Sequence, residues 1–327
     1  MPPHYTHILM YIILSPLILA SIVGNIITLI VKLNRRKNKN FNSGDLFVIN
    51  LAICDLNKTW IVFYLWIYNT VIHNSWQSTE LSCSVFQKLA VILFTITSLT
   101  LLVLTTERYF LIAKPFNRSF TFKKGRRLLI GIWLTVIVIS STPYFMQFKL
   151  QKINGANQCF SVGGQHTVVL VLEAIYYVAV MFVPCILIMI MSSKAAKLLH
   201  KNSSTNISPQ MKCCPVFNKK MQRNQSAVYI LRSISLGHII CYIPWAFYYM
   251  IQAVQPELIG KIVDNSLIQP VTGWFIFGSF CNTPFTYIIF STEFRKEVRE
   301  IFTHKRHKGT TRRKLSPTKV APSLAAP

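Results

Sequence analysis

Seven long stretches of the chain are almost entirely apolar. Each is close to, or longer than, the ~20 residues that a helix needs to cross the hydrocarbon core of a membrane. Charged side chains occur inside them only in the second stretch, as Asp55 and Lys58. The runs lack the alternating polarity of transmembrane β-strands, so the pattern predicts an all-α membrane protein built as a seven-helix bundle. The stretches are residues 8–31, 46–72, 89–106, 128–148, 174–193, 233–256 and 265–292.

The rest of the chain is divided around this bundle. With polar helix ends included, the predicted spans are about 8–31, 46–72, 83–112, 128–148, 168–193, 227–254 and 265–290, within a bundle of residues 8–292. Residues 1–7 are expected to form a short extracellular tail. Residues 293–303 are predicted to form an amphipathic cytoplasmic helix, and residues 304–327 a disordered basic tail.

The charge distribution predicts the orientation. The chain carries 35 Lys and Arg against 10 Asp and Glu, a formal net charge of +25, which in a soluble protein would favour nucleic acid as a partner. However, 30 of the basic residues lie in the odd-numbered connections and after the last stretch, and four lie on the other side. Because basic residues favour the cytoplasmic side, we expect a multi-pass plasma-membrane protein with its N-terminus outside, and no nucleic-acid partner.

Each span, and the segment just after the last one, contains a short motif or a single distinctive residue. They are Gly24-Asn25, Asn50-Leu-Ala-Ile-Cys-Asp55, Cys83, Glu107-Arg108-Tyr109, Trp133, Pro184, Cys241-Tyr242-Ile243-Pro244, Thr283-Pro284-Phe285-Thr286-Tyr287 and Glu293-Phe294-Arg295. In this order, the chain from Gly24 to about Phe302 resembles the rhodopsin-like (class A) G-protein-coupled receptors, and among them neuropeptide receptors. The resemblance implies signal transduction from an extracellular ligand to a heterotrimeric G protein. It also implies contact with the lipid bilayer, arrestin and a receptor kinase.

The resemblance further implies roles for the motif residues. Glu107, Arg108 and Tyr109 would couple to the G protein, with Glu107 holding Arg108 in the inactive state. The activation motifs would be Tyr242, Pro244, Thr283, Pro284 and Tyr287, which take part as helix six swings outward.

A disulfide is predicted at the outer side. Cys83 precedes Arg108 by 25 residues, or about 37 Å of helix, so the two residues lie at opposite ends of the third span. Cys159 is also expected outside, where the secretory route is oxidising. A Cys83–Cys159 disulfide would therefore fasten the outer loop to the third helix.

Polar groups inside a membrane are costly and mark functional candidates. The resemblance implies that Asp55 anchors a sodium ion and a water network; no other cofactor and no further metal is expected. Lys58 lies on nearly the same helix face as Asp55, which leaves two alternatives. Lys58 either pairs with Asp55 and takes the role of sodium, or points into the ligand cavity or a water channel. The predicted network comprises Asn25, Asp55, Lys58, Thr97, Ser279 and Asn282.

Several positions depart from the family pattern. Tyr242 replaces a tryptophan, Thr283 replaces an asparagine, and Ser192 stands where the fifth span has a tyrosine. The foot of span six, around Arg223 and Asn224, lacks an acid that would hold Arg108. We therefore expect raised basal signalling, and a non-signalling decoy receptor is an alternative.

The ligand class is the least determined property. Ala90 stands where amine receptors have an aspartate, and the seventh span has no lysine for a retinal Schiff base, so amines are disfavoured and a light-sensing opsin is excluded. Aromatic side chains with a few charges favour a short peptide, with a lipid or other small molecule as the alternative. The candidate pocket residues are Gln87, Lys88, Glu173, Tyr176, Tyr242, Trp245, Tyr248, Tyr249 and Trp274.

Other classes fit less well. A transporter would need a continuous polar path, and only Asp55 and Lys58 are charged within the spans, so it is a remote alternative. An enzyme is not expected, because His238 stands alone in its span and no metal set or carboxylate pair is present. No cysteine follows Cys281, so the lipid anchor common after the seventh span is not expected.

Overall fold

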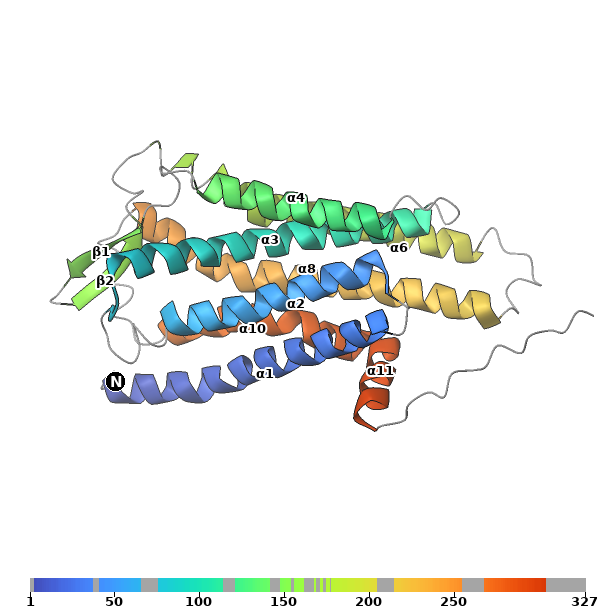
Figure 1. The fold of residues 1–327 in the computed structure, drawn as a ribbon, viewed down its shortest axis with the longest axis horizontal. Coiled ribbons are helices and arrows are strands. Elements are labelled where there is room, and N and C mark those ends of the chain that lie inside the picture. The colour runs from blue at the N-terminus through green and yellow to red at the C-terminus, as the bar shows by residue number, and fades with distance from the viewer. Residues whose placement is uncertain are drawn as a thin grey trace, which may run out of the picture.

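The structure is a computed structural model, and most of the chain's helical part is described in it. The described residues are 3–37, 41–65, 76–113, 121–141, 148–153, 156–161, 168, 171–172, 175–176, 178–204, 215–254 and 268–303. Long helices run side by side along one axis, as Figure 1 shows. A β-hairpin lies at one end of this bundle, and a short helix crosses the other end. We refer to these as the hairpin end and the α11 end.

The helices correspond to the predicted apolar stretches and extend beyond many of them. Polar end residues continue the helices at the α11 end, where Arg35, Arg36 and Lys37 form the last turn of the first helix. The helices are α1 (Pro3–Lys37), α2 (Ser43–Val62), α3 (Glu80–Ala113), α4 (Phe122–Ser140), α6 (Val183–Ser204, preceded by a π-helical turn Val178–Phe182), α8 (Pro215–Val254), α10 (Ile268–Phe290) and α11 (Thr292–Phe302).

Five helices in the described part of the chain are long and apolar enough to cross a membrane. They cover Leu14–Lys37, Ser43–Leu65, Glu80–Ala113, Val178–His200 and Asn224–Pro244. Helix α4 is not among them because its first six residues include four basic ones, Lys123, Lys124, Arg126 and Arg127. Such residues are well placed at a membrane surface, where they can reach the lipid headgroups.

Side-chain caps fix where three helices begin. Asn42 accepts a hydrogen bond from the backbone N–H of Asp45, and the Asp45 side chain accepts one from the Asn42 N–H, which makes a capping box for α2. Thr121 caps α4, and Ser291 caps α11. The Ser291 cap ends the straight run of α10 and lets α11 turn across the bundle (Figure 1).

The apolar core follows the whole length of the bundle. Toward the hairpin end it contains Phe94, Phe277 and Phe280, and toward the α11 end it includes Phe47 and Ile234. Many residues on the outside of the bundle are apolar as well. Apolar side chains on both surfaces of a helix are expected where the outer one faces lipid, and this agrees with the membrane assignment from the sequence.

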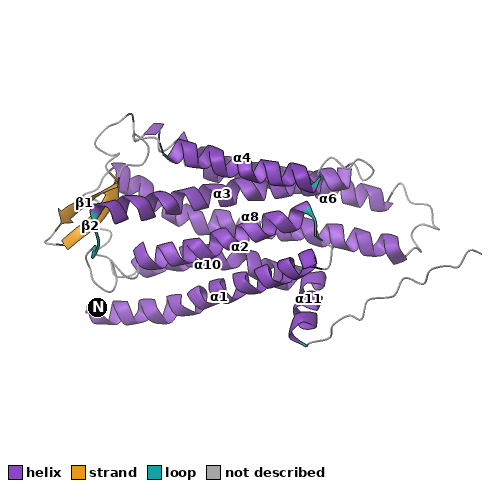
Figure 2. Cartoon of the chain, viewed as in Figure 1, coloured by secondary structure: helices purple, strands orange, loops and turns teal. Residues whose placement is uncertain are grey.

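The one sheet in the described residues is a two-stranded hairpin at the end opposite α11 (Figure 2). Strands β1 (Phe148–Ile153) and β2 (Ala156–Ser161) pair antiparallel, with Leu150 opposite Cys159. These strands were not expected from the sequence. The fourth apolar stretch was expected to end at residue 148, which is where β1 begins.

Candidate functional site

The centre of the bundle contains an ion pair that is sealed from solvent. Asp55 and Lys58 lie one turn apart on α2, and both side chains are 0% exposed. The Lys58 Nζ is 2.6 Å from Asp55 Oδ1. It also lies 5.1 Å from the centre of the Phe94 ring and 5.2 Å from that of Phe280. The ammonium is thus enclosed by groups from α2, α3 and α10, of the kind that stabilise a cation.

The other predicted network residues are buried or half-buried, yet they use their hydrogen bonds elsewhere. Thr97 donates to the Leu93 carbonyl at 2.8 Å, and Ser279 to the Ile276 carbonyl at 2.7 Å, each within its own helix. Asn25 joins two helices, because its amide donates to the Phe280 carbonyl of α10 at 3.0 Å.

Asn282 joins α10 to α8. Its amide donates to the Ile234 carbonyl at 2.7 Å and approaches His238 Nδ1 at 3.5 Å. This contact depends on Gly237, since a Cβ atom there would overlap the Asn282 side chain. The predicted six-residue set therefore divides into a charged centre around Asp55 and a separate polar contact between α8 and α10.

The predicted activation residues surround this centre. The Tyr242 ring is buried 5.1 Å from those of Phe94 and His238. Pro244 and Pro284 lie inside α8 and α10, where a proline removes a backbone hydrogen bond and permits bending. A buried threonine, Thr283, precedes Pro284.

Close packing joins α1 to the proline of α10. An added Cβ atom at Gly24 would lie 2.8 Å from Pro284 Cβ and Cγ, which is too close for any side chain. Glycine therefore lets α1 approach Pro284 of α10 closely. Further along α10, the Tyr287 ring packs 5.6 Å from Phe294 of α11.

The predicted G-protein-coupling residues lie at the α11 end of α3. Glu107 is buried and accepts a hydrogen bond from the Ser43 hydroxyl of α2. Arg108 lies over the backbone of Gly44, where any side chain would collide with its guanidinium. Both residues are described, and no ion pair within 4 Å joins Glu107 to Arg108. Tyr109 packs against a small apolar cluster shared by α3, α6 and α8.

A charged network at the same end was missed in the sequence analysis. Asp45 of α2 accepts from Lys32 at 2.9 Å and from Arg35 at 3.0 Å, both from α1. Arg35 also pairs with Glu293 and Glu297 of α11, each at 2.7 Å. Burial raises the pKa of the Glu297 carboxyl, and the neighbouring Arg35 charge opposes that rise. We call these five residues the α11 clamp, because they tie α11 to α1 and α2.

A second interhelical contact uses two motif positions. Asn50 of α2 donates to the Thr100 hydroxyl of α3 at 3.0 Å, and its carbonyl oxygen accepts from the Trp133 indole of α4, also at 3.0 Å. The two motif residues thus join three helices through one amide.

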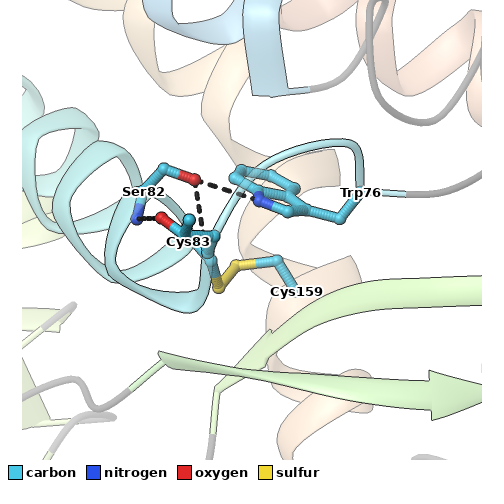
Figure 3. The surroundings of a disulfide bond; sticks show 5 residues. Trp76, Ser82, Cys83 and Cys159 are labelled. Atoms are coloured by element: carbon cyan, nitrogen blue, oxygen red, sulfur yellow. Dashed lines mark hydrogen bonds between the residues drawn. A yellow bond between two sulfur atoms is a disulfide. The ribbon is translucent and has the colours of Figure 1, made fainter.

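The predicted disulfide is confirmed at the hairpin end. Cys83 and Cys159 are bonded, with their Cα atoms 5.8 Å apart. Figure 3 shows Trp76 beside this bond, with its indole nitrogen directed at Ser82 at 3.1 Å. The Trp76 backbone N–H donates to the Asn157 carbonyl of β2 at 2.6 Å. The bond and these contacts fasten the hairpin to the first turns of α3.

The predicted ligand-pocket residues are described unevenly. Tyr176 is hydrogen-bonded to Thr95 of α3 at 2.6 Å, and Tyr242 is buried in the core. Gln87 and Lys88 are half-buried on α3, whereas Trp274 is 48% exposed on α10. Glu173 lies outside the described residues, as do the side chains of Trp245, Tyr248 and Tyr249.

Comparison with known proteins agrees with this arrangement. Residues 24–287 match the family described as 7 transmembrane receptor (rhodopsin family). The chain belongs to this family, and it is therefore a multi-pass membrane protein and a G-protein-coupled receptor. The family is one of receptors and not of enzymes.

The relatives are distant and have several ligands. The chain is 24% identical to type-1 angiotensin II receptor B of Xenopus laevis over 310 residues, which covers 91% of this chain and 80% of that receptor. It is 23% identical to neuropeptide receptor 15 of Caenorhabditis elegans over 320 residues (90% and 89%). It is also 23% identical to the histamine H2 receptor of Rattus norvegicus over 312 residues (92% and 82%).

Proposed function

We propose that this receptor binds a short extracellular peptide and transmits the binding to a heterotrimeric G protein by outward movement of α8. The hairpin end would face the outside of the plasma membrane, and the α11 end the cytoplasm. The observation that carries this proposal is the placement of Arg108 at the α11 end of α3, far from the disulfide that fastens the same helix at its other end. One rigid helix thus connects a ligand-facing end to a G-protein-facing end.

The contacts of α8 support its movement. Near the α11 end, α8 packs through apolar residues, Val228 against Ile112 and Leu199, and Leu231 and Ile234 in the neighbouring cluster. Among the α8 side chains that the structure describes, residues 222, 224–244, none forms an ion pair with another helix. Apolar contacts are non-directional, so α8 can slide at a lower cost than if a salt bridge had to break. Raised basal signalling follows from this arrangement.

The hairpin and the relatives support a peptide ligand. In a two-stranded sheet, each strand has one edge that is not hydrogen-bonded to the other strand. An extended peptide can bind such an edge through its backbone. Two of the relatives are named for angiotensin and for neuropeptides. One is named for the amine histamine, but Ala90 supplies no charge to hold an amine.

G-protein activation in cells expressing the chain tests this proposal. Activation is measured without ligand and then with panels of short peptides, lipids and amines, beside the Arg108→Ala variant. Arg126→Ala is the matched control, because Arg126 is an exposed arginine at the same end of the bundle. Surface expression is measured for all three proteins.

We expect a peptide response and a basal signal above vector-only cells, both lost in Arg108→Ala and kept in Arg126→Ala. A response to amines or lipids alone would overturn the peptide assignment and keep the receptor mechanism. Silence of a surface-expressed receptor across all panels would favour a decoy receptor. A signal that survives Arg108→Ala would contradict the role proposed for Arg108.

A further inference from the structure

We infer that Lys58 is a built-in cation that occupies the place where the family resemblance implies a sodium ion, and that the bundle is therefore insensitive to sodium. This inference concerns the centre of the bundle and does not depend on the ligand or on the G protein. It rests on two features of that centre: the position of the ammonium and the character of the walls around it.

The ammonium already occupies one of the two carboxylate oxygens of Asp55. Its 2.6 Å separation from the carboxylate oxygen is that of a direct contact pair. Both residues are on α2, one turn apart, so the ammonium stays attached to the helix that holds the acid. A bound ion has to reach such a site from solution, whereas Lys58 is always present at it.

The walls of the site suit an organic ammonium better than a metal ion. Phe94 and Phe280 lie on two different helices, and their rings are 5.9 Å apart. Each ring is within 6 Å of Lys58 Nζ, the range in which an aromatic face attracts a cation. A small hard metal ion needs oxygen ligands in place of its water, and a phenyl ring supplies none.

Three of the polar groups predicted around Asp55 donate their hydrogen bonds to backbone carbonyls. The Thr97 and Ser279 hydroxyls are directed at carbonyls of their own helices. The Asn282 amide group donates to the Ile234 carbonyl of α8. The donating hydroxyls keep oxygen lone pairs that can ligate a metal ion, so it is the Lys58 ammonium that keeps the residues at Asp55 from fitting a sodium ion.

Electrostatics adds a further barrier to a second cation. Two unit positive charges 4 Å apart, at the effective dielectric constant typical of protein sites, repel enough to weaken binding by about a thousandfold. Sodium at millimolar concentrations would then have no measurable occupancy beside Lys58. If Lys58 loses its charge, the unpaired Asp55 becomes an attractive site for sodium.

The test is the thermal unfolding midpoint of the purified receptor in sodium chloride and in equimolar choline chloride. We expect equal midpoints for the natural chain. Lys58→Met keeps the length of the side chain and removes its charge, and we expect sodium to raise its midpoint by about 2 °C relative to choline, as for an ion at tenfold its Kd. If that variant does not fold, Lys58→Gln replaces it.

Two controls separate the site from a general salt effect. In Asp55→Asn/Lys58→Met the acid is gone as well, so the sodium effect should disappear. Lys32→Met removes a lysine from the other paired acid of α2, Asp45, and should show no sodium-specific gain, because Arg35 still pairs with that acid.

Two results would overturn the inference. One is a sodium-specific rise for the natural chain that is lost in Asp55→Asn. The other is a folded Lys58→Met or Lys58→Gln variant that shows no difference between sodium and choline. Either would mean that the Lys58 charge is not what decides sodium binding at Asp55.

Discussion

Two aspartates of α2 are each paired with a lysine, yet their pairs are built differently. Asp55 pairs with Lys58 of the same helix, and both are fully sealed in the core. Asp45, ten residues earlier, pairs with Lys32 and Arg35 of another helix, and Arg35 extends the network to α11. The first salt bridge lies within one helix, and only the aromatic contacts of Lys58 reach α3 and α10, whereas the salt bridges of the second link three helices. A salt bridge within one helix does not itself join helices, which favours a role in function.

The cost of breaking each pair follows from these surroundings. Removing one partner of the first pair leaves a lone buried charge beside phenylalanine rings, and burial of a lone ion is expensive. A charge left alone at the α11 end has other partners nearby, and the Glu293 side chain is 45% exposed. The same type of substitution should therefore have a larger effect at Asp55 than at Asp45.

The largest effect is expected for Asp55→Asn. The variant leaves the Lys58 ammonium unpaired in the core, and loss of one partner of a buried pair costs about 3–5 kcal/mol of unfolding free energy. The double variant Asp55→Asn/Lys58→Met removes both charges and should recover most of that loss. Asp45→Asn should lose less than Asp55→Asn. Unfolding of the purified proteins measures all three, and a double variant as unstable as the single one would contradict the pairing.

The difference between the two pairs also explains what could be predicted from the sequence. The Asp55–Lys58 contact is local, so helix periodicity alone brings the two side chains to one face. The Arg35–Glu297 contact joins residues 262 positions apart, and no local pattern indicates which acid in α11 meets which base in α1. The Cys83–Cys159 bond is also distant, but few cysteines were expected outside the membrane, which made that pairing predictable.

The hairpin and the hydrogen-bond partners of interior side chains could not be predicted from the sequence, for a related reason. β1 follows directly on a long apolar stretch, so hydropathy does not mark where the span stops and the strand begins. Thr97, Ser279 and Asn282 were expected in the interior, but whether a hydroxyl or amide is directed at its own helix or at a neighbour depends on packing. Helix periodicity predicts on which face of a helix a residue lies, but not which group of a neighbouring helix it contacts.

Gly24→Ala tests close packing near the buried pair and is expected to have the next largest effect. The added methyl would overlap the ring of Pro284, and a proline ring inside a helix cannot move aside, so a loss of about 1–3 kcal/mol is expected. Gly131→Ala is the matched control, because no atom lies within 4 Å of the added methyl. Because alanine favours a helix over glycine by up to about 1 kcal/mol, we expect Gly131→Ala to be as stable as the natural chain or more stable. Equal unfolding midpoints for the two variants would contradict the close approach of α1 to α10.

Arg35→Gln tests the α11 clamp. The substitution removes the charge that joins Asp45 to Glu293 and Glu297. Since the partners are only partly buried, we expect the free energy of local opening of α11 to fall by about 1–2 kcal/mol. Hydrogen exchange of the α11 amides should therefore become faster by about tenfold. Lys296→Gln is the control, because Lys296 is 72% exposed and 3.8 Å from its partner Glu300. Unchanged exchange in Arg35→Gln would show that other contacts hold the helix, among them Phe294, the Ser291 cap and the Arg295 hydrogen bonds to α10.

The smallest effect is expected at the link between α2 and α3, and it should appear in signalling more than in stability. Ser43 donates to Glu107 across these helices, so Ser43→Ala leaves a buried carboxylate with one donor fewer, which costs about 1 kcal/mol. If that bond belongs to the inactive arrangement, its loss raises basal G-protein activation by about fivefold. Ser141→Ala, at an exposed serine at the hairpin end of α4, is the control. A fall in basal activation would instead assign the Ser43–Glu107 bond to the active arrangement, and it would reverse the role proposed for Glu107.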